Sequence, residues 1–219
     1  RSIMLTQGAK HLTHPRPPAD GHVVLLGDSN LHFEAAARCS GALPGMSMLT
    51  FCTAATVAGM IRIGITRTLP WIHVLPIHTR GLNLNDDTWD ALNAITGLLT
   101  GGLILLVAGQ NDADWWVRTG REGVSSPRAF ADWVTGRLTR LRRWVDAKPG
   151  WTLITLLPFD DGGHHFSPEY PMLVRALREV LLGCTVAWDV TDLPLTFLPD
   201  HWHLTAPARK MLANRLSGH

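Results

Sequence analysis

The chain has 219 residues, 46% of them hydrophobic and 17% charged, which fits one globular domain with a sizeable core. Its longest apolar stretch, about Gly101 to Gly109, is far shorter than the roughly 20 residues of a membrane-spanning helix, so we interpret it as a buried strand. The formal net charge of +2 is too small to indicate nucleic-acid binding by itself.

The cysteines and the N-terminus predict an intracellular protein. The three cysteines, Cys39, Cys52 and Cys184, cannot all pair within the chain, and buried free thiols are the ordinary expectation. No Asn-x-Ser/Thr acceptor occurs, and the first residues lack the layout of a signal peptide. The chain does not begin with Met, and we expect a domain excised from a larger protein.

Apolar runs along the chain predict its strands. Residues 1–20 are basic and polar and contain three prolines near their end, which predicts a linker or surface arm before one domain over residues 21–219. Five runs then predict strands covered on both faces: His22 to Leu26, Met46 to Cys52, Leu103 to Ala108, Trp151 to Leu157 and Thr185 to Val190. We expect irregular structure between residues 61 and 85, with an extra strand near Trp71 to Leu75 as the alternative.

Stretches with helical spacing lie between these runs. The clearest starts at Ser126 and Pro127, a cap and a first-turn proline, and repeats apolar side chains on one face. These are Phe130, Val134, Leu138, Leu141 and Val145. Further helices are expected at Leu31 to Arg38, Asp87 to Leu99, Pro168 to Leu182 and Ala206 to Leu216. The alternation predicts an α/β fold with a doubly wound, five-stranded parallel sheet, and functional residues at the carboxyl ends of its strands.

Two polar motifs follow predicted strands. Ser29, in Gly-Asp-Ser-Asn at residues 27–30, occupies a strand-to-helix turn, which exposes a serine hydroxyl and aims backbone N–H groups at an approaching ligand. Asn111 and Asp112 follow Gly109, and a rigidly held Asn side chain can donate to the oxyanion of a tetrahedral intermediate. Each motif alone also fits a plain turn or a helix cap.

A third motif precedes the last expected helix and supplies a candidate base. An imidazole acts as base for a serine when an acceptor on its second nitrogen holds one tautomer, and Asp200 can supply that acceptor to His203 from three residues earlier. His201 lacks this spacing. A capped helix followed by a surface histidine is the alternative.

Together the three motifs resemble the SGNH (GDSL-like) hydrolase family, whose conserved blocks occur in the same order across residues 21–219. The resemblance implies a three-layer α/β/α, flavodoxin-like fold. It also implies that Ser29 is the nucleophile, His203 the general base and Asp200 its orienting partner. The Asn111 amide and the Ser29 N–H would line the oxyanion hole. Family members need no metal or organic cofactor and act on acyl esters, from lipids and acetylated sugars to small thioesters.

Two positions depart from the family pattern. A glycine usually follows the second strand and donates its N–H to the oxyanion, whereas Ala54 or Ala55 occupies the corresponding stretch here, and Gly59 is the nearest glycine. Alanine still carries an N–H, so Ala54 is our candidate for this donor. Asn30 replaces the usual leucine and removes no catalytic group.

Other residues suggest a substrate pocket and possible partners. Asn30, Trp115, Trp116 and Trp202 are expected to rim the site as a wall for an acyl chain or a platform for a sugar ring, with packing under loops as the alternative for the tryptophans. The predicted helix after Pro127 carries a basic patch. We interpret it as a solvent-exposed helix face, with binding to nucleic acid, phosphate or an anionic membrane as the alternative. Its residues are Arg137, Arg140, Arg142 and Arg143, with Lys148 beyond.

Adjacent histidines and aspartates raise the question of a metal site. Asp160, Asp161, His164 and His165 lie in a glycine-containing loop, which we interpret as a flap beside the site. We therefore expect a metal-free serine esterase for lipid or acetylated-sugar esters. The alternatives are an acyltransferase, which shares the acyl-serine intermediate, and a catalytically weak binding or scaffolding module.

Overall fold

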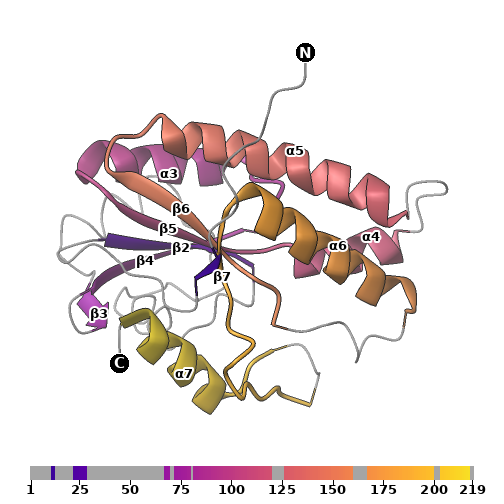
Figure 1. Cartoon of the computed structure of the whole chain (residues 1–219). Coiled ribbons are helices and arrows are strands. Elements are labelled where there is room, and N and C mark those ends of the chain that lie inside the picture. The colour runs from indigo at the N-terminus through magenta and orange to yellow at the C-terminus, as the bar shows by residue number, and fades with distance from the viewer. Residues whose placement is uncertain are drawn as a thin grey trace.

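The computed structural model describes residues 11–12, 22–28, 67–69, 72–79, 81–119, 126–159, 167–199 and 203–217. Within them, seven strands form one sheet in the order β1-β7-β6-β5-β2-β4-β3 (Figure 1). The strands are β1 (His11–Leu12), β2 (His22–Gly27), β3 (Arg67–Leu69), β4 (Ile72–His78), β5 (Gly102–Val107), β6 (Trp151–Leu156) and β7 (Val186–Trp188). Neighbouring strands are parallel except β3 and β4.

Helices cover both faces of this sheet, which gives the three layers expected from the sequence. They are α3 (Asp86–Leu98), α4 (Gln110–Arg118), α5 (Pro127–Asp146), α6 (Glu169–Cys184) and α7 (Ala206–Ser217). Figure 1 shows α3, α4, α5 and α6 on one side of the sheet and α7 on the other. No described helix is long and apolar enough to cross a membrane.

The core follows the apolar patterns in the sequence. All six residues of β5 are buried, as expected for a central parallel strand covered on both faces. The predicted stripe on α5 is confirmed, since all five of its side chains are buried. The Ser126 hydroxyl caps that helix by accepting the N–H of Ala129 at 3.1 Å.

The strand count differs from the five strands expected. Four predicted strands correspond to β2, β5, β6 and β7, whereas the run at residues 46–52 and the helix at residues 31–38 lie outside the described residues. Strand β4 forms within the region where we expected irregular structure, and it confirms the alternative of an extra strand near Trp71 to Leu75. Pro76, His73 and His78 interrupt the apolar pattern of this segment, so its sequence favoured an irregular structure. Strand β4 pairs in parallel with all six residues of β2, and this pairing forms the strand despite that pattern.

Two further elements were missed for local reasons. Strand β1 is only two residues long and lies within the segment expected to be a linker or surface arm, where it pairs with the edge of β7. Helix α4 has nine residues and starts in a polar sequence, so its short apolar pattern did not predict a helix. The division into an arm and one domain stays a prediction.

Candidate active site

The first and second sequence motifs meet at one edge of the sheet. Gly27 ends β2 directly opposite Val107, which ends β5, and the N–H of Asp28 donates to the Val107 carbonyl at 3.1 Å. A side chain at Gly27 would overlap that carbonyl, so glycine permits this close approach. Ser29 and Asn30, which follow Asp28 in the sequence, lie outside the described residues.

The segment after β4 joins the same edge. The N–H of Thr79 donates to the Gly27 carbonyl at 2.6 Å, and the Thr79 hydroxyl donates to the Gly81 carbonyl at 2.8 Å. The carboxyl ends of β4, β2 and β5 therefore lie side by side, and backbone hydrogen bonds join the residues that follow them.

A left-handed glycine places Asn111 at this edge. Gly109 has a φ of 112°, and a Cβ there would lie 2.7 Å from the Leu177 methyl groups. Both observations explain why glycine turns the chain from β5 into α4. Asn111 then lies in the first turn of α4 and is partly exposed, as an oxyanion donor must be.

Asp112 fixes the segment after β4 to the first turn of α4. Its Oδ2 accepts the Leu82 N–H at 2.9 Å, and its carboxylate fills the space that a side chain at Gly81 would need. Burial raises the pKa of Asp112 to about 6, although the Leu82 N–H and the Arg137 guanidinium favour the charged form. The residue beside Asn111 thus holds two strand ends in place.

His203 ends a closed loop near the same region. The His203 carbonyl accepts the Leu198 N–H at 2.7 Å, and Phe197 forms a bridge with Leu204. The Phe197 ring lies 6.0 Å from the Phe159 ring, and Phe159 shares a hollow with Asp28. Asp200, His201 and Trp202 lie outside the described residues, as does Ala54.

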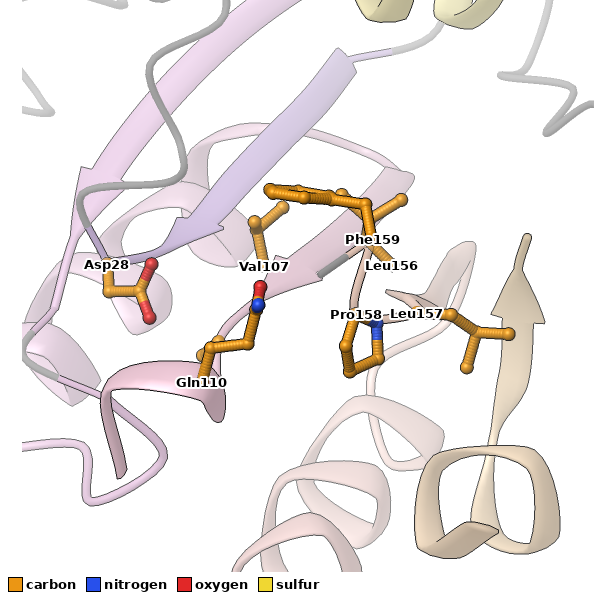
Figure 2. Close-up of a pocket in the computed structure, with 8 residues that line it drawn as sticks. Asp28, Val107, Gln110, Leu156, Leu157, Pro158 and Phe159 are labelled. Atoms are coloured by element: carbon orange, nitrogen blue, oxygen red, sulfur yellow. The ribbon is translucent and has the colours of Figure 1, made fainter. Parts of the chain in front are cut away.

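The hollow lies between the carboxyl ends of β2, β5 and β6 (Figure 2). Its lining residues are Asp28, Val107, Ala108, Gln110, Leu156, Leu157, Pro158 and Phe159. Gln110 and Phe159 were not predicted from the sequence. Their placement directly after β5 and β6 is the signal that points to them, because the ends of neighbouring parallel strands meet.

The tryptophans expected at the rim separate into two environments. Trp115 is 44% exposed. Trp116 is only 5% exposed and packs edge-on against Phe130 at 5.4 Å and beside Trp133 at 5.7 Å. The assignment of Trp116 to the substrate pocket is therefore wrong, because successive helical residues point in different directions and this one faces α5.

Most arginines of the basic patch contact other residues of the protein. Arg137 lies over Trp133 and Arg140 over Trp89, with 5.4 and 4.9 Å from guanidinium carbon to ring centre. Arg142 donates to the Cys184 carbonyl at 2.9 Å. The described residues contain no cluster of three or more potential metal ligands, and residues 160–166 lie outside them.

No family model and no curated protein matches the sequence. Solved structures do match the fold. An aryl esterase of M. smegmatis has a TM-score of 0.53 at 14% identity, covering 90% of this chain and 97% of its own. A protein of Parabacteroides merdae described as a GDSL-like lipase has a TM-score of 0.50 at 15% identity, covering 91% and 96%. An α/β hydrolase from the Lake Arreo metagenome has a TM-score of 0.50 at 14% identity, covering 91% and 94%.

These likenesses extend over nearly the whole of each chain, and they define an α/β fold that esterases and lipases use. Among these structures, the Parabacteroides merdae protein is the one described as GDSL-like. The chain has the SGNH (GDSL-like) hydrolase fold.

Proposed function

We propose that the chain is a serine esterase that hydrolyses acyl esters through an acyl-serine intermediate. One observation carries the proposal: the backbone hydrogen bond from Asp28 to Val107 joins the strand end before Ser29 to the strand end before Asn111. Asp28, the residue before Ser29, and the first turn of α4, which contains Asn111, therefore share one edge of the sheet, which supports the assignment of these two roles. The fold of known esterases and lipases supports the same reaction class.

The proposed reaction uses the three motifs in sequence. The Ser29 hydroxyl attacks the ester carbonyl while His203 takes its proton, and Asp200 holds the imidazole in the required tautomer. The oxyanion accepts hydrogen bonds from the Asn111 amide and the Ser29 N–H. His203 then protonates the departing alcohol, and a water molecule activated by His203 releases the acyl group.

Two parts of the chain are candidates for a further N–H donor to the oxyanion. Ala54 follows the second apolar run, as the family pattern requires. However, β4 is the described strand beside β2, and the segment that begins at Thr79 follows β4 at this edge. That segment is held against α4 through Asp112, so it is the second candidate for this donor.

Ser29→Ala tests the proposal directly. We expect the variant to lose turnover of 4-nitrophenyl acetate and labelling by a fluorophosphonate probe. Ser126→Ala is the matched control, because it removes a serine hydroxyl that caps a helix, and it should retain both. Equal turnover in Ser29→Ala and wild type would refute the assignment. A folded wild-type protein that neither reacts with the probe nor turns over ester would favour the binding or scaffolding alternative.

A further inference from the structure

The contact between Asp112 and Leu82 joins two segments that lie thirty residues apart in the sequence. Asp112 is only 8% exposed, and its Oδ2 accepts the Leu82 N–H at 2.9 Å. A Cβ at Gly81 would overlap the same carboxylate, so the chain passes close to Asp112 at two successive residues. The carboxylate therefore links the turn after β4 to the first turn of α4.

The turn after β4 is itself held in place, so this link has a firm anchor. The N–H of Thr79 donates to the Gly27 carbonyl at 2.6 Å. The buried Thr79 hydroxyl donates to the Gly81 carbonyl at 2.8 Å and accepts the Gly81 N–H at 3.3 Å. Hydrogen bonds thus run from the end of β2 through this turn to Asp112.

The position of Asn111 depends on this link. Asn111 directly precedes Asp112 in the first turn of α4, and the helix begins after Gly109, which has no side chain to cap it. An N-terminal turn without such a cap has fewer contacts that fix it in place. Asp112 supplies a buried hydrogen bond from this turn to the neighbouring strand end. Losing that bond would let the Asn111 amide shift relative to the edge of the sheet.

We propose that Asp112 is a positioning residue for ester hydrolysis, and that it holds the Asn111 amide at the place where the oxyanion forms. Asp112 acts through Asn111 and does not itself contact the reacting atoms. A donor to the oxyanion contributes mainly in the transition state, so displacing it lowers kcat and leaves KM nearly unchanged. This inference rests on the proposed ester hydrolysis and adds a residue on which that reaction depends.

Steady-state kinetics with 4-nitrophenyl acetate test this role. Asp112→Ala should lower kcat by about ten- to a hundredfold at nearly constant KM, because a displacement of about 1 Å can cost a hundredfold. Asp112→Asn keeps an acceptor oxygen for the Leu82 N–H and should restore most of the lost kcat. An unchanged kcat in Asp112→Ala, or equal losses in Asp112→Ala and Asp112→Asn, would overturn the inference.

Asp189→Ala is the matched control for the loss of a buried carboxylate. Asp189 is 7% exposed, its Oδ1 accepts the Thr191 N–H at 2.9 Å, and it pairs with Arg178 at 3.3 Å. The variant should lower the melting temperature, as Asp112→Ala does, but keep the wild-type kcat. A loss of kcat equal to that in Asp112→Ala would show a general effect of destabilisation and would overturn the inference.

A double-mutant cycle with Asn111→Ala shows whether Asp112 acts through that amide. Asn111→Ala should lower kcat by about a hundredfold or more. Adding Asp112→Ala should then cost little more, because the amide that Asp112 positions is already absent. Losses that multiply independently would overturn the inference. Gly81→Ala displaces the carboxylate without removing it, so it serves in the same cycle if Asp112→Ala does not fold.

A measurement without substrate separates this inference from the esterase proposal. NMR relaxation of the Asn111 side-chain amide, assigned by its absence in Asn111→Ala, should show a rigid group in wild type and in Asp112→Asn. The same amide should be mobile in Asp112→Ala. If this pattern holds and no ester is turned over, the esterase proposal fails and Asp112 still positions Asn111. If the amide is equally rigid in all three proteins, the inference fails whether or not esters are hydrolysed.

Discussion

Replacing Asp112 by Asn should change how the stability of the protein depends on pH. Burial raises the pKa of Asp112 from 3.8 to about 6, so the native state binds a proton more tightly than the unfolded chain does. The stability contributed by this group is full below pH 3.8 and is lost as the pH rises through about 6. Arg137 on α5 is the charged residue that opposes this loss.

The magnitude follows from the two pKa values. The full difference corresponds to about 3 kcal/mol, of which about 2 kcal/mol falls between pH 4.5 and pH 7. Asn at this position keeps an acceptor oxygen for the Leu82 N–H and carries no charge. The stability of Asp112→Asn relative to wild type should therefore rise by about 2 kcal/mol over that interval.

Urea unfolding at a series of pH values measures this difference, since contributions from other titrating groups cancel between the two proteins. Asp114→Asn is the matched control, because it makes the same change on the same helix at a less buried carboxylate that pairs with Arg118. A difference between Asp112→Asn and wild type that is the same at pH 4.5 and pH 7 would refute the reasoning. So would a difference that moves in the opposite direction.

Two further substitutions test the packing around the site. Trp116→Ala should lower the free energy of unfolding by about 3–5 kcal/mol because it empties a core position, whereas Trp115→Ala should lower it by less than about 1 kcal/mol. Chemical denaturation measures both losses. Similar losses in the two variants would contradict the assignment of Trp116 to the core. Gly109→Ala should destabilise the protein by about 1–3 kcal/mol, because of its positive φ and the contact with Leu177; a melting temperature equal to that of wild type would contradict this.

Local patterns in the sequence predicted much of the fold and the order of the motifs. The apolar stripe on α5 repeats at helical spacing within a helix of twenty residues. A repeat of that length predicts an amphipathic helix, because only a helix places all of these side chains on one face. The central strands are continuous apolar runs between polar turns. The motif of Ser29 and that of Asn111 each follow such a strand, so their place at a sheet edge was also predictable.

Tertiary structure decided the features that depend on which distant segments become neighbours. Strand β4 forms despite Pro76 because β2 pairs with it, and no property of the segment alone predicts that partner. Trp115 and Trp116 are adjacent and identical in type, yet only the position of α5 buries one of them. Gln110 faces a hollow because β6 ends beside β5. Residue periodicity is a property of the chain itself, whereas burial, a raised pKa and a hollow exist only after separate segments have packed together.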